Sequence, residues 1–121
     1  MTTIRREYAG RVLLRAAGDP AERIIEGIVV PYGEVATVRD TPGGPVYREA
    51  IAPGALEGLD PSTVLLEYLP ETTPREWNTH DGARLIGRAI AADTARPEGA
   101  HMAFRVSRTA AGDEAYELAR D

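Results

Sequence analysis

The chain has 121 residues, of which 43% are hydrophobic and 27% are charged. This length supports one packed core and is too short for two ordinary domains, so we expect residues 1–121 to form a single domain. The absence of cysteine excludes disulfides, cysteine zinc sites and cysteine nucleophiles. The formal net charge of -5 argues against binding to a phosphate backbone, so we expect no nucleic-acid partner.

The sequence carries no sign of a membrane or secretion signal. No apolar run approaches the roughly 20 residues that a membrane-spanning helix needs, and residues 1–7 lack the apolar core of a signal peptide. We therefore expect a soluble, intracellular protein with no membrane partner. All 14 basic residues are arginine, which excludes a Ser-Lys catalytic dyad and a lysine Schiff base.

The first half of the chain predicts short strands separated by turns. Residues 11–16 and 24–30 are rich in branched apolar side chains and flank the turn-forming residues 18–22, which predicts an opening hairpin. Further along, the pattern predicts a break at 31–33, a turn at 41–45, a strand at 46–50, a corner at 52–56 and a strand at 63–66. Residues 67–76 carry two prolines and several glutamates, which predicts an exposed loop.

The second half predicts a hairpin followed by a helix. Residues 85–91 and 101–107 have strand patterns and are joined by a segment that contains Pro97 and Gly99. In the second strand Met102, Phe104 and Val106 alternate with polar or small residues, so we expect these three side chains to face the core.

A helix is expected after the second strand. Thr109 is suited to cap its N-terminus, although Gly112 occupies the position at which a glutamate would complete a capping box. Ala111, Ala115 and Leu118 are spaced so that they share one helix face. Together these elements predict an α+β fold that is mainly antiparallel β, a small barrel or sandwich with one packed helix.

Four groups of residues, in order along most of the chain, are similar to the prohead maturation proteases of tailed bacteriophages. They are Ile25-Glu26-Gly27 with Val30-Pro31-Tyr32-Gly33, Tyr47-Arg48-Glu49 with Ala52-Pro53-Gly54-Ala55, His80-Asp81 with Ile86-Gly87-Arg88, and Thr109 with the segment from Gly112 to Leu118. The resemblance implies a closed antiparallel β-barrel related to the herpesvirus assembly proteases. It also implies a serine endopeptidase that cleaves scaffold and capsid-protein extensions, within assembling proheads in the bacterial host cytoplasm.

The resemblance implies a catalytic role for one residue, His80, as the general base for a serine nucleophile. A serine hydroxyl needs such a base within hydrogen-bonding reach before it can attack a carbonyl. Asp81 is expected to have a structural role, because neighbouring residues of an extended segment point to opposite faces. The family commonly has asparagine directly before the His-Asp pair, whereas Thr79 intervenes here, and this changes the register of His80 unless a bulge absorbs it.

The nucleophile that the resemblance requires has no counterpart in this chain. In the family it follows the helix that matches residues 111–118, and this chain ends at Asp121. The serines present, Ser62 and Ser107, do not lie in a glycine-rich elbow that could provide an oxyanion hole. We therefore expect an incomplete protease domain that is inactive alone, requires no cofactor or metal, and has a major capsid or scaffold protein as its partner.

Alternative interpretations remain open from the sequence. The chain could be a non-catalytic, protease-fold assembly protein of a phage or phage-derived particle, or an unrelated β-rich binding module. His80, Asp81 and His101 have the residue types of a metal site without a diagnostic spacing, and His101 is expected on the polar face of its strand. Trp77 and Tyr68 could cover the end of the core or form a docking surface. Apolar surface exposed by an incomplete domain could also support homo-oligomers.

Overall fold

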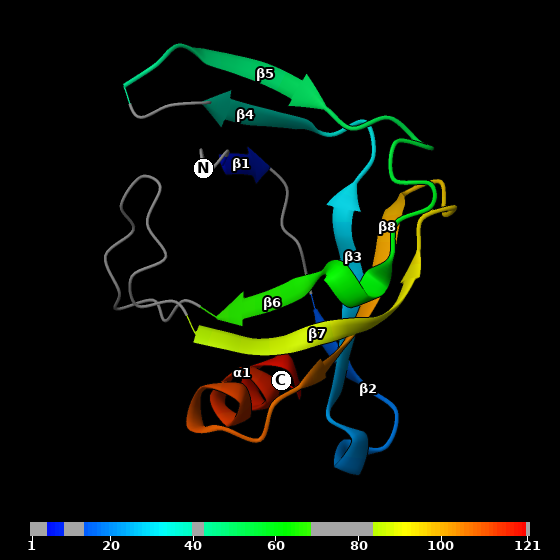
Figure 1. Ribbon diagram of the computed structural model, residues 1–121, viewed down its shortest axis with the longest axis vertical. Coiled ribbons are helices and arrows are strands. Elements are labelled where there is room, and N and C mark those ends of the chain that lie inside the picture. The colour runs from blue at the N-terminus through cyan, green and yellow to red at the C-terminus, as the bar shows by residue number, and fades with distance from the viewer. Residues whose placement is uncertain (1–4, 9–13, 40–42, 69–83, 121) are drawn as a thin grey trace.

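The computed structural model describes residues 5–8, 14–39, 43–68 and 84–120, and these residues contain two antiparallel sheets and one α-helix (Figure 1). The strands are β1 (Arg5–Tyr8), β2 (Arg15–Ala17), β3 (Ile24–Pro31), β4 (Val35–Arg39), β5 (Val46–Ala50), β6 (Leu65–Tyr68), β7 (Arg84–Asp93) and β8 (Gly99–Val106). The helices are α1 (Ala110–Arg120) and the short 3-10 helices η1 (Pro20–Glu22) and η2 (Pro61–Thr63). The expectation of a mainly antiparallel α+β fold is confirmed.

The larger sheet has the strand order β2-β3-β8-β7-β6, and the smaller sheet has the order β1-β4-β5. The expected closed barrel is not formed by the described strands. Closure needs an unbroken hydrogen-bond ladder around the barrel. Here β2 and β6 are the two edges of the larger sheet, and no described ladder joins them to each other or to the smaller sheet.

The opening hairpin is confirmed, with a shifted first strand. Arg15 lies opposite Glu26 and Ala17 opposite Ile24, whereas residues 11–13 of the expected strand lie outside the described residues. The turn is η1, at whose N-terminus the backbone N–H of Ala21 donates to Oδ1 of Asp19. The turn ends at Arg23 in the left-handed conformation, with φ of 56°.

The smaller sheet contains two strands that the sequence reading did not predict, β1 and β4. The fifth strand of the chain, β5, confirms the strand expected at residues 46–50. In β4, Ala36 and Val38 are buried while Val35 and Thr37 are exposed, as expected of a strand with one buried face. The chain passes between the sheets at Gly33, whose N–H donates to the carbonyl of Ile51 at 2.9 Å.

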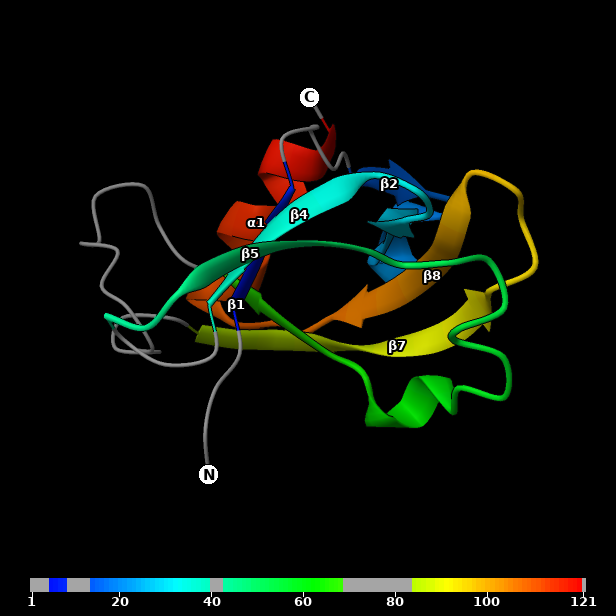
Figure 2. The ribbon, with the colours of Figure 1, turned by 90° about the horizontal axis from the view of Figure 1, so that it is seen from above.

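Strands β7 and β8 form the centre of the larger sheet and confirm the predicted hairpin. Figure 2 shows the two strands side by side, with their connecting loop at the end of the sheet far from α1. Met102, Phe104 and Val106 are each at most 3% exposed, as the alternation predicted. They belong to the core, which also contains Ile25, Ala89, Ala100 and Tyr116.

The helix α1 packs on the core face of the larger sheet through Tyr116, which is 4% exposed. Thr109 is its N-cap, as predicted, because the Gly112 N–H donates to Thr109 Oγ1 at 3.1 Å. The expected common face of Ala111, Ala115 and Leu118 is not the buried one, since Leu118 is 59% exposed. The buried positions are Gly112 and Tyr116 because the large aromatic side chain turns into the core.

The region around β6 requires two further corrections. The strand expected at residues 63–66 begins at Leu65, because Thr63 belongs to η2. The loop expected from Glu67 begins later, since Glu67 and Tyr68 continue β6. Both residues pair with β7, with Glu67 opposite Leu85 and Tyr68 opposite Arg84.

Candidate functional site

The predicted general base, His80, lies outside the described residues, as do Trp77, Thr79 and Asp81. The described chain stops at Tyr68 on β6 and resumes at Arg84 on β7. These two residues lie opposite each other in the antiparallel ladder. The described residues on either side of this gap therefore lie at the same end of the larger sheet, and the predicted role of His80 stays a prediction.

Ser62 is held in a capped turn rather than beside a base. Its Oγ donates to Oδ1 of Asp60 at 2.8 Å, and its backbone N–H donates to the same oxygen at 3.0 Å. These two hydrogen bonds, the hydroxyl bond first, hold the pKa of Asp60 below its ordinary value. The Ser62 hydroxyl therefore belongs to the cap of its own turn, and no described imidazole is hydrogen-bonded to it.

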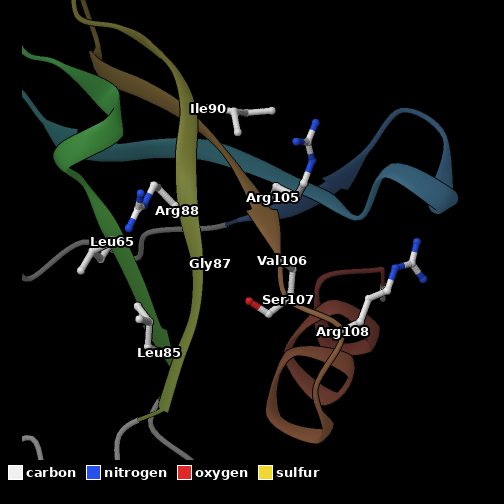
Figure 3. Close-up of a pocket in the computed structure, with 9 residues that line it drawn as sticks. All are labelled: Leu65, Leu85, Gly87, Arg88, Ile90, Arg105, Val106, Ser107 and Arg108. Atoms are coloured by element: carbon white, nitrogen blue, oxygen red, sulfur yellow. The ribbon is translucent and has the colours of Figure 1, made fainter.

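Ser107 directly follows β8 and lines an open groove of about 510 Å³ (Figure 3). Its backbone N–H donates to the carbonyl of Ile86 at 2.6 Å, and its carbonyl accepts from the guanidinium of Arg23 at 3.0 Å. Within the described parts of the chain, no imidazole or carboxylate is hydrogen-bonded to the Ser107 hydroxyl. Ser107 lies between a strand and a helix, but Arg105 and Thr109 occupy the two positions at which a nucleophile elbow has glycine.

The groove is built on the face of the larger sheet that points away from the core, which we call the outer face. Along β8, Arg105 alternates with the buried Phe104 and Val106 and so belongs to the outer face. Arg105 lies directly opposite Arg88 of β7, and Arg88 lies opposite Leu65 of β6. The three strands thus place one row of outer-face residues side by side: Leu65, Arg88 and Arg105.

The arginines of this groove have no carboxylate partner among the described residues. Among the described residues, neither the Arg88 nor the Arg105 side chain forms a hydrogen bond or an ion pair. Arg108, at the end of the groove, donates to the backbone carbonyl of Ala21 at 2.9 Å. The groove is therefore a local concentration of positive charge on a chain whose formal net charge is -5.

Large apolar side chains surround these arginines. Leu65 is 49% exposed, Leu85 is 58% exposed and Ile90 is 47% exposed, and all three line the groove. Gly87, beneath them, is needed for the close approach of β7 to β8, because a Cβ atom there would lie 2.5 Å from the carbonyl oxygen of Arg105. The outer face can therefore contact apolar and anionic groups at the same place.

The sequence analysis did not predict this groove, although it placed two of the groove's arginines in predicted strands. Arg105 was recognised on the polar side of an alternating strand, and Arg88 belongs to a predicted strand. Their juxtaposition depends on the pairing register, in which the bulge between Ala89 and Ala91 shifts the two strands. The residues at this bulge, Ala89-Ile90-Ala91, include no glycine or proline that would have indicated it.

His101 is on the outer face of β8, as expected, with its Nε2 4.0 Å from Oε2 of Glu26. Across the hairpin, Asp93 accepts hydrogen bonds from the Ala95 N–H and from Arg96, and these bonds lower the pKa of its carboxyl group. In residues 5–8, 14–39, 43–68 and 84–120, no three His, Asp or Glu side chains are grouped closely enough to hold a metal ion. No helix within those ranges is long and apolar enough to cross a bilayer.

Comparisons of this chain with protein-family models, with curated proteins and with solved structures gave no match.

Proposed function

We propose that this chain is the histidine-bearing part of a prohead-type serine endopeptidase, and that its two sheets belong to a protease-type barrel. The proposal is supported by the order of the residue groups that resemble this family. Ile25-Glu26-Gly27 lies in β3, Tyr47-Arg48-Glu49 in β5, Ile86-Gly87-Arg88 in β7, and the segment from Gly112 to Leu118 in α1. These parts of the groups lie in strands or in the helix, whereas Pro53-Gly54-Ala55 lies in a turn and His80-Asp81 lies outside the described residues.

In this proposal His80 is the general base. Its imidazole removes the proton of a serine hydroxyl as that hydroxyl attacks the scissile carbonyl of a scaffold or capsid protein, and then donates the proton to the leaving amine. The nucleophile is neither Ser62, whose hydroxyl donates to Asp60, nor Ser107, which has no base beside it among the described residues. The chain by itself is therefore expected to leave its substrate uncleaved.

The test incubates two forms of the protein with a capsid protein and a scaffold protein as candidate substrates. The chain of 121 residues should leave both proteins at full intact mass. If the reading frame continues past Asp121, the longer product should cleave them, and His80→Ala should reduce its kcat/KM by about a thousandfold or more. Cleavage by the chain alone, or a longer product that is unaffected by His80→Ala, would contradict the proposal.

A second candidate function is favoured by the groove on the outer face. Exposed apolar side chains beside unpaired arginines are typical of a binding surface and are not needed for catalysis. The chain would then be a non-catalytic assembly protein that keeps the protease fold. Co-purification with the capsid or scaffold protein, together with full-length substrate in every reaction, would favour this function over the first.

A further inference from the structure

Two arginines lie directly opposite each other at the centre of the outer face. Side chains directly opposite each other in an antiparallel pair are about 5 Å apart at Cβ, and like charges at such positions repel. Arg88 and Arg105 occupy such a pair of positions. Figure 3 shows their side chains leaving in different directions, with that of Arg88 extending over β6 and that of Arg105 away from it. The arrangement leaves both guanidinium groups free to bind an external anion.

The side chains next to these arginines are apolar, so the anionic group of a ligand that fits here is attached to apolar groups. Leu65 and Leu85 lie on the β6 side of the groove, and Ile90 lies beside Arg105 (Figure 3). Each of these side chains is close to half exposed. A bound aliphatic side chain would remove this apolar surface from water, which is favourable. A ligand that fits this surface combines carboxylates with aliphatic groups.

We propose that the groove on the outer face binds an acidic, leucine-rich peptide segment of a partner protein. A carboxylate of the peptide forms bidentate hydrogen bonds with Arg88 or Arg105, and its aliphatic side chains cover Leu65, Leu85 and Ile90. A nucleic acid fits less well, since its backbone needs positive charge along its whole length. The outer face instead places apolar side chains on both sides of the arginines, and the chain is acidic overall.

This inference goes beyond the proposed function, because it uses only described residues of β6, β7 and β8. It holds whether the chain is part of a protease or an assembly protein. The arginine pair and the aliphatic side chains make separate contributions, so removing the charge and removing the apolar surface should each weaken binding.

The probe is a short fluorescent peptide in which a central Glu-Glu pair is flanked on each side by two leucines. Fluorescence anisotropy with the whole chain should show saturable binding that weakens as salt is added. A matched peptide with Gln-Gln at the centre, another with serines in place of the leucines, and a short single-stranded RNA should each bind at least about tenfold more weakly.

The variants test the assignment of residues. Arg88→Gln and Arg105→Gln should each weaken binding of the Glu-Glu peptide about tenfold, and Leu65→Ser should weaken it about fivefold. Arg120→Gln is the matched control and should change nothing, because Arg120 pairs with Glu117 on the helix that covers the opposite face of the sheet. The Arg88→Glu, Arg105→Glu double variant should lose the Glu-Glu peptide and bind a Lys-Lys version of it.

Each result decides the inference. A cooperative thermal unfolding transition is required of every variant, so that a loss of binding is not mistaken for a loss of folding. Equal binding of the Gln-Gln and Glu-Glu peptides, stronger binding of the RNA, or no binding of any peptide would overturn the proposal. The His80→Ala chain is measured in parallel and should bind the peptide normally, so failure of the protease proposal and failure of this one are distinguishable.

Discussion

The guanidinium of Arg23 lies 2.6 Å from the carboxylate of Asp113, and this ion pair joins the turn before β3 to the first turn of α1. The same guanidinium donates to the carbonyls of Val106 and Ser107, and it lies 5.3 Å from the centroid of the Tyr116 ring. The Arg23 side chain is 14% exposed, whereas that of Asp113 is 60% exposed. Arg23 therefore connects the C-terminal end of β8 to the helix that follows it.

Arg23→Met should lower the free energy of unfolding by about 2–3 kcal/mol, because it leaves two backbone carbonyls without their donor and removes the ring contact. Asp113→Asn should cost only about 0.5 kcal/mol, since an exposed ion pair contributes little. Urea unfolding monitored by circular dichroism measures both values. Equal losses in the two variants would show that the ion pair, rather than the carbonyl contacts, holds the helix.

Thr109→Ala should destabilise the chain by about 1 kcal/mol, because the Gly112 N–H loses the side-chain oxygen that caps it. Thr109→Ser retains that oxygen and is the matched control. Chemical denaturation of the two variants gives the comparison. A cost in Thr109→Ser as large as in Thr109→Ala would assign the effect to the lost methyl group.

Gly112→Ala tests the contact between α1 and the end of β8. Helix propensity alone predicts stabilisation of about 1 kcal/mol. The added Cβ, however, would lie in severe contact with the carbonyl oxygen of Ser107, so we expect a net loss of about 2 kcal/mol. Ala115→Gly measures the propensity effect in the same helix. A more stable Gly112→Ala variant would mean that α1 can move away from Ser107 freely.

Ser62→Ala should raise the pKa of Asp60 toward its ordinary value, because the larger of the two hydrogen bonds that lower that pKa is removed. A carboxyl whose pKa is lowered by folding stabilises the folded state above its unfolded pKa, and this contribution disappears as the pH falls through the folded pKa. The variant should therefore be less stable than the parent at neutral pH, and the difference should shrink below about pH 4. A carboxyl carbon NMR titration of Asp60 and unfolding curves at several pH values measure the two effects.

Arg88→Glu should stabilise the chain by about 0.5 kcal/mol when no ligand is present, because it places a carboxylate opposite Arg105. Arg88→Gln should have a smaller effect of the same sign. Thermal unfolding at low salt is the appropriate measurement, since salt screens the interaction. A clear loss of stability in both variants would show that Arg88 supports the sheet.

The sequence predicted those parts of the fold in which apolar side chains repeat. The alternation of Met102, Phe104 and Val106 identified the core face of β8 because each of these large side chains is buried there. Thr109 was identifiable as a cap from its residue type and its position before a helix. Alternation and capping depend on residues close together in the sequence. Both predictions hold because no contact with a distant segment opposes them.

The features that were missed depend on contacts between distant segments. The sequence gives no sign that Tyr116 rather than Leu118 would turn inward, because both are apolar and the sheet decides which one it accommodates. Strand β4 has a short and weakly apolar pattern, and it is a strand because β1 and β5 pair with its two edges. The opposition of Arg88 to Arg105 likewise follows from a bulge in the β7 and β8 ladder.

The hydrogen bond at Gly33 closes the β4–β5 hairpin into an excursion from the larger sheet, and β1 pairs with the other edge of β4. The chain leaves β3 at Pro31 and has come back to the same point at Ile51, where the Gly33 N–H donates to its carbonyl. Because the ends of this excursion are held together, a hairpin of different length or sequence could replace β4 and β5 without altering the register of β3 on β8. The hairpin can therefore vary without disturbing the larger sheet, provided that β4 keeps an edge on which β1 can pair.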